Sequence, residues 1–191
     1  MIIKGTKQLR SFKRGINIYT PKKNNTISTS PGLYGRRYVG YFGSLTDTND
    51  NVNWFSTAIK QGQTNQLTQI NNFTSNADLY SWEWIGYFTP STSETYTFYT
   101  TSDDASYLWI GDIAKNGYTT ANATVNNGGL HAPGETSGSI SLIANRKYPI
   151  RIQFGENGGG DIITVSFSTP TISKTTNGAN YYSYNITTNG F

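Results

Sequence analysis

The stretch that decides the fold is residues 80–112, which reads YSWEWIGYFTPSTSETYTFYTTSDDASYLWIGD. Three runs within it are rich in aromatic and β-branched residues, and short polar segments at 90–93 and 102–104 separate them. Such runs favour strands, and the polar segments between them favour turns. We therefore predict three consecutive strands, at residues 80–89, 94–100 and 105–111.

Further strands are predicted on both sides of this stretch. In residues 148–154 and 162–168, apolar side chains alternate with polar ones, which is the period of a strand that buries one face. Residues 54–60 favour one helical turn, and the polar residues 61–69 are predicted to be irregular. Many short strands at this spacing predict an all-β fold, an antiparallel sandwich. The remaining predicted strands cover residues 33–42 and 138–143.

The composition excludes several kinds of site. The 191 residues contain no cysteine, so disulfides, thiol nucleophiles and thiolate metal sites are excluded. His131 is the only histidine, which leaves no obvious zinc site and no Ser-His-Asp relay of known spacing. No segment is long and apolar enough for a signal peptide or a membrane span, so we expect synthesis in a cytoplasm and no membrane insertion.

Charge is distributed unevenly along the chain. Residues 1–46 contain nine basic residues and no acidic one, whereas the rest carries six basic and eleven acidic residues. Such a segment is typical of an arm that docks on an anionic or protein partner, and a solvated tail is the alternative. We expect an extended basic arm at residues 1–30, a sandwich at 31–170, and a C-terminal extension or edge strand at 171–191. The arm is not dense enough in Lys and Arg to predict nucleic-acid binding.

Two loops carry the residues with candidate chemistry. Asp103 and Asp104 are adjacent at a strand boundary, where neither carboxylate would be buried without a partner. Residues 155–161, GENGGGD, add Asn157 and Asp161, and the glycines allow backbone conformations closed to other residues. Calcium prefers oxygen ligands of these kinds, about six to eight of them. Taken singly, each loop is also explained as an ordinary turn or a tight hairpin.

The order and spacing of the motifs resemble the PA14 domain family. That family is a β-sandwich of the jelly-roll type, found in bacterial toxins, glycosidases, yeast flocculins and related fungal adhesins. The resemblance covers about residues 33–170. It rests on the segments Gly86-Tyr87-Phe88-Thr89-Pro90, Tyr96-Thr97-Phe98, Ser102-Asp103-Asp104, Leu108-Trp109-Ile110-Gly111-Asp112, Gly138, Tyr148-Pro149-Ile150-Arg151-Ile152 and Asn157-Gly158-Gly159-Gly160.

The resemblance implies a specific calcium site. In the lectin members, two aspartates joined by a cis peptide bind Ca²⁺, and the ion bridges to sugar hydroxyls. Carried over by motif, the ligands here are Asp103, Asp104 and Asn157, with the carbonyls of Gly159 and Asp161. The implied carbohydrate site combines Asp103, Asp104 and Asn157 with the loop of His131. The fungal lectins also have disulfides and distinctive sugar-contacting loops, which this chain lacks, so the identity of the sugar does not carry over.

The pattern is also similar to PA14-type segments in tailed-phage structural proteins. This implies a virion protein, made in the host cytoplasm, whose arm docks on virion structural proteins and whose sandwich binds a cell-surface glycan during adhesion. The alternative is a decoration or assembly protein in which calcium only stabilises loops. The oligomeric state stays open. No enzymatic activity is expected, because nothing marks one of the acids as a general acid.

Overall fold

The structure is a computed structural model that describes residues 27–42 and 54–191. Most of the predicted basic arm lies outside the described residues. The elements along the chain are β1 (Thr29–Pro31), β2 (Leu33–Val39), α1 (Trp54–Thr57), β3 (Lys60–Leu67), β4 (Tyr80–Phe88), β5 (Glu94–Asp103), β6 (Ala105–Ile110), the 3₁₀ turns η1 (Asp112–Ala114) and η2 (Thr120–Asn122), β7 (Val125–Asn127), β8 (Gly134–Leu142), β9 (Tyr148–Glu156), β10 (Ile162–Ser168) and β11 (Tyr182–Asn185).

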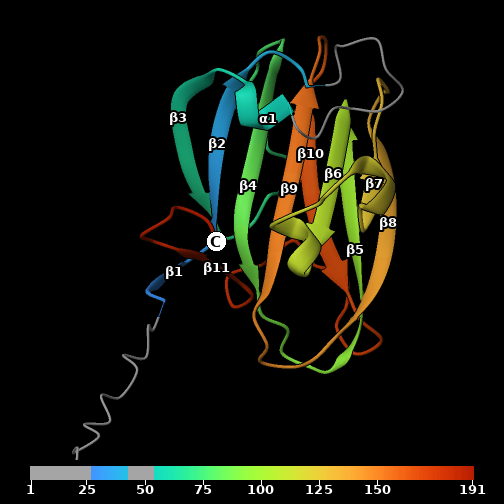
Figure 1. Cartoon of the computed structure of the whole chain (residues 1–191). Coiled ribbons are helices and arrows are strands. Elements are labelled where there is room, and N and C mark those ends of the chain that lie inside the picture. Colours follow the sequence, from blue (N-terminus) through green and yellow to red (C-terminus); the bar gives the residue numbers. More distant parts are fainter. Residues whose placement is uncertain (1–26, 43–53) are drawn as a thin grey trace, which may run out of the picture.

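Two antiparallel sheets form the two layers of a sandwich (Figure 1). The larger sheet has eight strands, with β1, β11, β4, β9, β6 and β7 in that order; β2 also pairs with β4, and β3 pairs with β2. The smaller sheet contains β10, β5 and β8. All the strand pairs in the described part of the chain are antiparallel. The predicted fold class, an all-β antiparallel sandwich, is confirmed.

The chain crosses between the layers three times at one end of the sandwich, through the β5–β6, β7–β8 and β9–β10 connections. Strands β5 and β6 follow each other in sequence but belong to different sheets, and so do β9 and β10. The register places Asp103, at the end of β5, beside Ile162, at the start of β10. It also places Ala105, at the start of β6, beside Gly155, near the end of β9. Both candidate loops of the sequence are therefore brought to one end of the fold.

The main core lies between the two sheets and is rich in aromatic rings. Strand β4 places Trp82 and Trp84 in this core, with 4% and 0% of their surface exposed. Phe73 meets both indole rings edge-on, with centroid distances of 5.4 and 5.2 Å. Full burial of each large apolar side chain contributes about 1.5–3 kcal/mol. Both tryptophans of β4 therefore belong to the core.

A second cluster of buried residues covers the outer face of the larger sheet. Trp109, from β6, is fully buried there, and α1 contributes Phe55. Because the central strands of the larger sheet have packed layers on both faces, β4 and β6 are buried almost throughout. In the smaller sheet, by contrast, β5 alternates buried and partly exposed residues, as the sequence pattern predicts for a strand with one solvated face.

The prediction of irregular structure at residues 61–69 is wrong. Residues Lys60–Leu67 form β3, which pairs with β2 at the side of the larger sheet. Its side chains are polar and mostly exposed on both faces, so no apolar alternation marks the strand. Backbone pairing with β2, together with the hydrogen bond from the Trp84 indole to Asn65 Oδ1 (2.9 Å), holds this segment in place.

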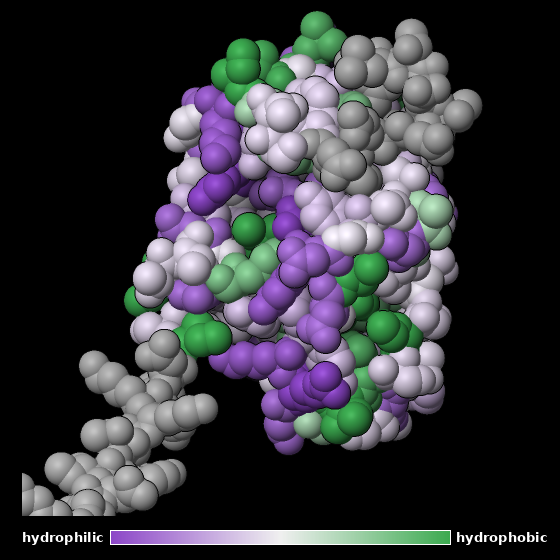
Figure 2. Space-filling view, viewed as in Figure 1, coloured by the Kyte–Doolittle hydropathy of each residue, from purple (hydrophilic) through white to green (hydrophobic). Residues whose placement is uncertain are grey.

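Both ends of the described chain join the larger sheet. Strand β1 begins at Thr29, inside the predicted arm, and pairs with β11. Strand β11 also pairs with β4, at Tyr182 and Ser183. Among the described residues, no helix is long and apolar enough to cross a membrane. On the face seen in Figure 2, hydrophobic residues form separate areas among hydrophilic ones, and none of these areas stands out as a continuous docking surface.

Candidate functional site

The Asp103–Asp104 pair forms the connection between β5 and β6. The peptide bond between the two residues is cis, as the family resemblance implies. The Asp104 side chain is buried, with 6% of the residue surface exposed, whereas Asp103 is half-buried. Burial and then the neighbouring charge of Asp104 raise the pKa of Asp103 above its ordinary value. The pair thus presents one carboxylate inward and one nearer the surface.

Asp104 holds two separate loops against this connection. Its Oδ2 accepts a hydrogen bond from the backbone N–H of Asn157 at 3.0 Å, and its Oδ1 accepts one from the backbone N–H of His131 at 3.1 Å. Both hydrogen bonds to Asp104 come from residues more than twenty positions away in the sequence. The loop of His131, which follows β7, and the loop after β9 are therefore part of the same site.

A third carboxylate, which the sequence-based ligand set does not include, completes the cluster. Glu156 is the last residue of β9, and one carboxylate oxygen each from Asp103, Asp104 and Glu156 lie within 4.8 Å of one another. Glu156 has none of its surface exposed. Burial and the charge of Asp104 raise the pKa of Glu156 to about 7. The sequence pattern that could have identified Glu156 is the alternation of Ile150, Ile152 and Phe154, which reaches Glu156 if the strand is extended by two residues.

The cluster lies above a polar layer at this end of the core. Ser102 and Ser106 share a hydrogen bond of 2.7 Å across the connection, and Ser106 also donates to Thr100 Oγ1 at 2.9 Å. Asn127, from β7, donates to Ser102 Oγ at 3.0 Å and accepts from Thr136 Oγ1 at 2.9 Å. These side chains satisfy one another, so the walls around the carboxylates are held in fixed positions.

The loop between β9 and β10 approaches the cluster from the other side. A side chain added at Gly160 would lie 3.3 Å from Asp103 Oδ2, so this glycine lets the backbone run close to the carboxylate. Gly159 has a φ of +109°, a backbone conformation that L side chains rarely adopt. Gly159 is thus favoured by its backbone conformation, and Gly160 leaves space for the Asp103 carboxylate.

Asp161 plays a different part from the other predicted site residues. Its carboxylate turns away from the cluster and accepts hydrogen bonds from the hydroxyl of Thr74, the backbone N–H groups of Ser75 (2.7 Å) and Asn76 (2.9 Å), and the hydroxyl of Tyr80 (2.5 Å). Burial works against ionisation, but these donors hold the pKa of Asp161 below its ordinary value. Only the backbone carbonyl of Asp161 is left for the role that the resemblance implies.

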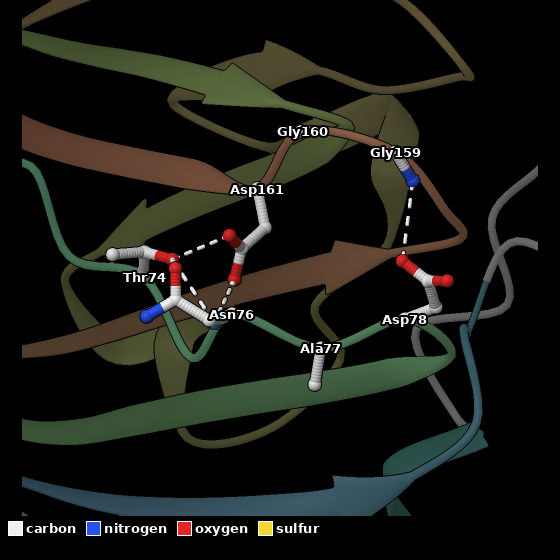
Figure 3. A pocket seen from close by; sticks show the side chains of 7 residues that line it. All are labelled: Thr74, Asn76, Ala77, Asp78, Gly159, Gly160 and Asp161. Atoms are coloured by element: carbon white, nitrogen blue, oxygen red, sulfur yellow. Dashed lines mark hydrogen bonds between the residues drawn. The ribbon is translucent and has the colours of Figure 1, made fainter.

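An open, mostly polar groove of about 570 Å³ lies between this loop and the segment before β4 (Figure 3). Asp78 forms one end of it, and its Oδ1 accepts the Gly159 N–H at 3.2 Å. At the other end, Asp161 is joined to Thr74 and Asn76. No local pattern predicts that the segment at residues 74–78 lies here, because its contacts reach residues more than eighty positions away.

The residues predicted for the site are thus brought to one end of the sandwich. Asp103, Asp104 and the backbone of Asn157 are in direct contact or adjacent, and Gly159 and Asp161 line the neighbouring groove. The ring of His131 lies beside the backbone: Nδ1 is 2.9 Å from the carbonyl oxygen of Ala132, and Nε2 is 3.3 Å from that of Asn127. His131 therefore contributes its backbone N–H to the site, through Asp104.

The donor set fits a hard divalent cation. Three carboxylates offer oxygens close enough to surround one ion, because Ca²⁺–oxygen distances of about 2.3–2.6 Å put opposite ligands roughly 5 Å apart. Both oxygens of Glu156 are buried and form no hydrogen bond of normal geometry in the protein. The described residues provide no sulfur ligand and no second histidine, and oxygen-only sites favour calcium or magnesium over zinc or copper.

Comparisons with known proteins give the same family as the motifs. Residues 80–169, from β4 to the end of β10, match the GLEYA domain family. The anti-sigma-I factor RsgI3 of Acetivibrio thermocellus is 37% identical over 78 residues, which are 40% of this chain and 11% of that protein. This chain therefore spans about a tenth of that relative.

Solved structures share the fold along most of this chain. The PA14 sugar-binding domain from an RTX adhesin matches with a TM-score of 0.63 and 14% identity, over 81% of this chain and 98% of that chain. The epithelial adhesin 6 A domain of Candida glabrata, in complex with Galb1-3GlcNAc, matches with a TM-score of 0.62 and 17% identity, over 84% and 89%. Chains described as anti-sigma factor domain-containing proteins also match, and this chain covers 48% and 47% of them. Residues 80–169 thus match the GLEYA domain family, and the chain shares the β-sandwich fold of solved PA14 domains.

Proposed function

We propose that this protein is a carbohydrate-binding module that holds its glycan with the help of a calcium ion. The observation that carries the proposal is the position of the acidic cluster directly beside an open polar groove at one end of the sandwich. A cation in the cluster would lie next to a space lined by hydroxyl, amide and carboxylate groups. That combination suits a ligand made of hydroxyl groups.

The cation would be held by Asp103 and Asp104, with the Asn157 side chain and the carbonyls of Gly159 and Asp161 as further oxygen ligands. Bound calcium supplies coordination positions that sugar hydroxyls can take over from water. The protein's own groups do the rest. Asp104 orders the two loops through its hydrogen bonds to Asn157 and His131, and the hydrogen bonds of Asp78 and Asp161 join the two walls of the groove to each other.

Relatives support a glycan as the ligand class. One matched solved domain is described as a PA14 sugar-binding domain, and another was solved with Galb1-3GlcNAc. Sugar identity is not carried over, because the identities of 14% and 17% support only the fold. Enzymatic activity is not proposed: none of the similar proteins named above is described as an enzyme.

A structural role for calcium is the second candidate, and the depth of the cluster favours it. Asp104 is 6% exposed and Glu156 is fully buried, so a cation there would join the β5–β6 connection to the end of β9 whether or not a sugar binds. If calcium has only this structural role, the binding partner of the domain is another protein and not a glycan. The virion setting and the docking of the basic arm on virion proteins stay predictions. The relatives named above include adhesins and an anti-sigma factor, and most of the arm lies outside the described residues.

Binding to a glycan array tests the proposal directly. The protein is applied in millimolar Ca²⁺ and again after chelation with EDTA, with Asp112→Asn as a control that removes one exposed carboxylate at the far end of β6. We expect specific binding in calcium, loss in EDTA and recovery when calcium is restored, for the wild type and the control alike. If calcium raises the melting temperature but no glycan is bound, the structural role is correct and the lectin proposal is wrong.

A further inference from the structure

Glu156 is the one residue of the cluster that the motif comparison does not explain. It continues the inward-facing series Ile150, Ile152 and Phe154 along β9, so its side chain enters the space between the two sheets. It is fully buried, and neither of its carboxylate oxygens forms a hydrogen bond of normal geometry, although the nearby backbone N–H of Gly158 acts to lower its pKa. Burying a charge without a partner is costly, so such a group is retained where something else satisfies it.

The surroundings of Glu156 show that this end of the core is otherwise well satisfied. In the adjoining polar layer, Ser102, Ser106 and Asn127 each have at least one hydrogen-bond partner. Asp104 has two backbone donors. The unpartnered oxygens therefore belong to one side chain, and that side chain lies within 4.8 Å of the two aspartate carboxylates.

We infer that Glu156 is an additional, innermost ligand of the cation at the Asp103–Asp104 connection. The inference rests on the cation of the proposed function and extends its ligand set by a third carboxylate. A single ion between the three side chains offsets their mutual repulsion and satisfies the otherwise unpartnered oxygens in one step. Glu156 approaches from inside the sandwich, which leaves the side of Asp103 and the groove for other ligands.

Two consequences distinguish this role from a packing role. A site with three carboxylates carries one more negative charge than the motif-derived set, which favours highly charged cations. The same charges repel one another whenever the cation is removed. Loss of the Glu156 carboxylate should therefore weaken cation binding and, at the same time, stabilise the cation-free protein.

The experiment compares the whole chain with Glu156→Gln and Glu156→Asp, using calcium itself as the probe. Gln keeps the size and one acceptor oxygen but removes the charge, and Asp keeps the charge but withdraws it by one methylene. Calcium affinity is measured by isothermal titration calorimetry, and melting temperatures are measured in calcium and in EDTA. Asp112→Asn, at the other end of β6, serves as the matched single-charge control.

We expect both Glu156 variants to bind calcium at least about tenfold more weakly than the wild type, while the control is unchanged. In EDTA the Glu156→Gln protein should melt at a higher temperature than the wild type. Equal calcium affinity for Glu156→Gln and the wild type overturns the inference. Wild-type calcium affinity in Glu156→Asp also overturns it, because the negative charge would then suffice without direct contact between the carboxylate and the ion.

The result is separable from the fate of the proposed function. If calcium binds through Glu156 but the wild type recognises no glycan, the ligand assignment stands and the lectin function is wrong. If the wild type binds glycan and calcium while Glu156→Gln binds both equally well, the function stands and the third ligand is wrong. A wild type that binds no calcium defeats both.

Discussion

The carboxylate of Asp104 accepts a hydrogen bond from the backbone N–H of Asn157, with 3.0 Å between Oδ2 and the nitrogen. Its other oxygen accepts the N–H of His131 at 3.1 Å. One side chain on the β5–β6 connection therefore fixes two loops that are distant in sequence. Hydrogen bonds to an ionised acceptor are about twice as strong as those between neutral groups. The shape of the site thus depends on Asp104 independently of its role as a ligand.

Replacing Asp104 by Asn should weaken calcium binding and lower stability together. The amide keeps one acceptor oxygen, but its NH₂ group faces one of the two backbone N–H donors, so one hydrogen bond is lost. We expect a loss of about 1.5–3 kcal/mol, which corresponds to a melting temperature lower by about 3–12 °C. Calcium affinity should fall by at least about tenfold, measured by calorimetry on the folded protein.

The same variant distinguishes the two roles of calcium. Under the lectin proposal, glycan binding per folded molecule falls in parallel with calcium occupancy. Under the structural alternative, calcium affinity and the melting temperature fall, but glycan binding per folded molecule is unchanged. Unaltered glycan binding by a folded, calcium-free Asp104→Asn protein would refute the calcium-lectin mechanism.

Much of the fold was predictable from local pattern. Aromatic and β-branched runs around Pro90 and alternation in residues 148–154 and 162–168 correctly indicated strands. The prediction that residues 148–154 bury only one face is wrong, because the polar side chains of Arg151 and Gln153 in β9 are buried as well. Strand β3 gave no such signal, since it is polar on both faces and depends on pairing with β2. Edge pairing is a tertiary effect that local composition does not record.

The site was predictable only in part, for a related reason. The Asp103–Asp104 pair and the glycine run are short, contiguous motifs, so the sequence marks them directly. Glu156 can be recognised as a site residue only when β9 is known to extend to its position. The segment at residues 74–78 can be recognised as a groove wall only when Asp161 is known to accept hydrogen bonds from Ser75 and Asn76. Contacts between residues more than eighty positions apart left no local signature in this chain.

Gly138 on β8 should tolerate no side chain. A Cβ atom built there would lie 1.6 Å from the carbonyl oxygen of Thr124, a backbone atom that cannot rotate away. Gly138→Ala is therefore expected to cost more than about 4 kcal/mol or to prevent folding. Gly134→Ala, on the same strand, is the matched control because its nearest contact would be an ordinary 3.6 Å. Circular dichroism melting curves of the two variants check the prediction, and similar melting temperatures would contradict it.

The ion pair between Glu83 and Arg151 should matter for stability but not for calcium. Both residues are buried on the larger sheet, and Glu83 also accepts the Gln153 amide at 2.9 Å. Arg151→Met leaves the Glu83 charge buried without its main partner, which costs about 3–5 kcal/mol. The double variant Glu83→Gln with Arg151→Met should recover part of that loss. Chemical denaturation measures stability, and calorimetry should find calcium affinity unchanged in every variant that folds.

Asp161 offers the sharpest test of whether the groove binds the glycan. Its carboxylate accepts hydrogen bonds from Thr74, Ser75, Asn76 and Tyr80, and this network holds the groove wall in place. In Asp161→Asn, the NH₂ group opposes donors that the carboxylate accepted. We expect a loss of about 2–4 kcal/mol, seen as faster amide hydrogen exchange in residues 74–78.

Calcium affinity and glycan affinity should respond differently to this change. Only the backbone carbonyl of Asp161 is proposed as a calcium ligand, so Asp161→Asn should keep calcium affinity within about threefold. Glycan affinity should fall by at least about tenfold, because a disordered groove wall must be ordered on binding, whereas a preformed site loses less entropy. Asp78→Asn, which keeps an acceptor oxygen for Gly159, is the matched control and should bind glycan nearly as the wild type does. If Asp161→Asn loosens residues 74–78 but leaves glycan affinity intact, the sugar is held elsewhere, and the groove is only the outer wall of a cation site.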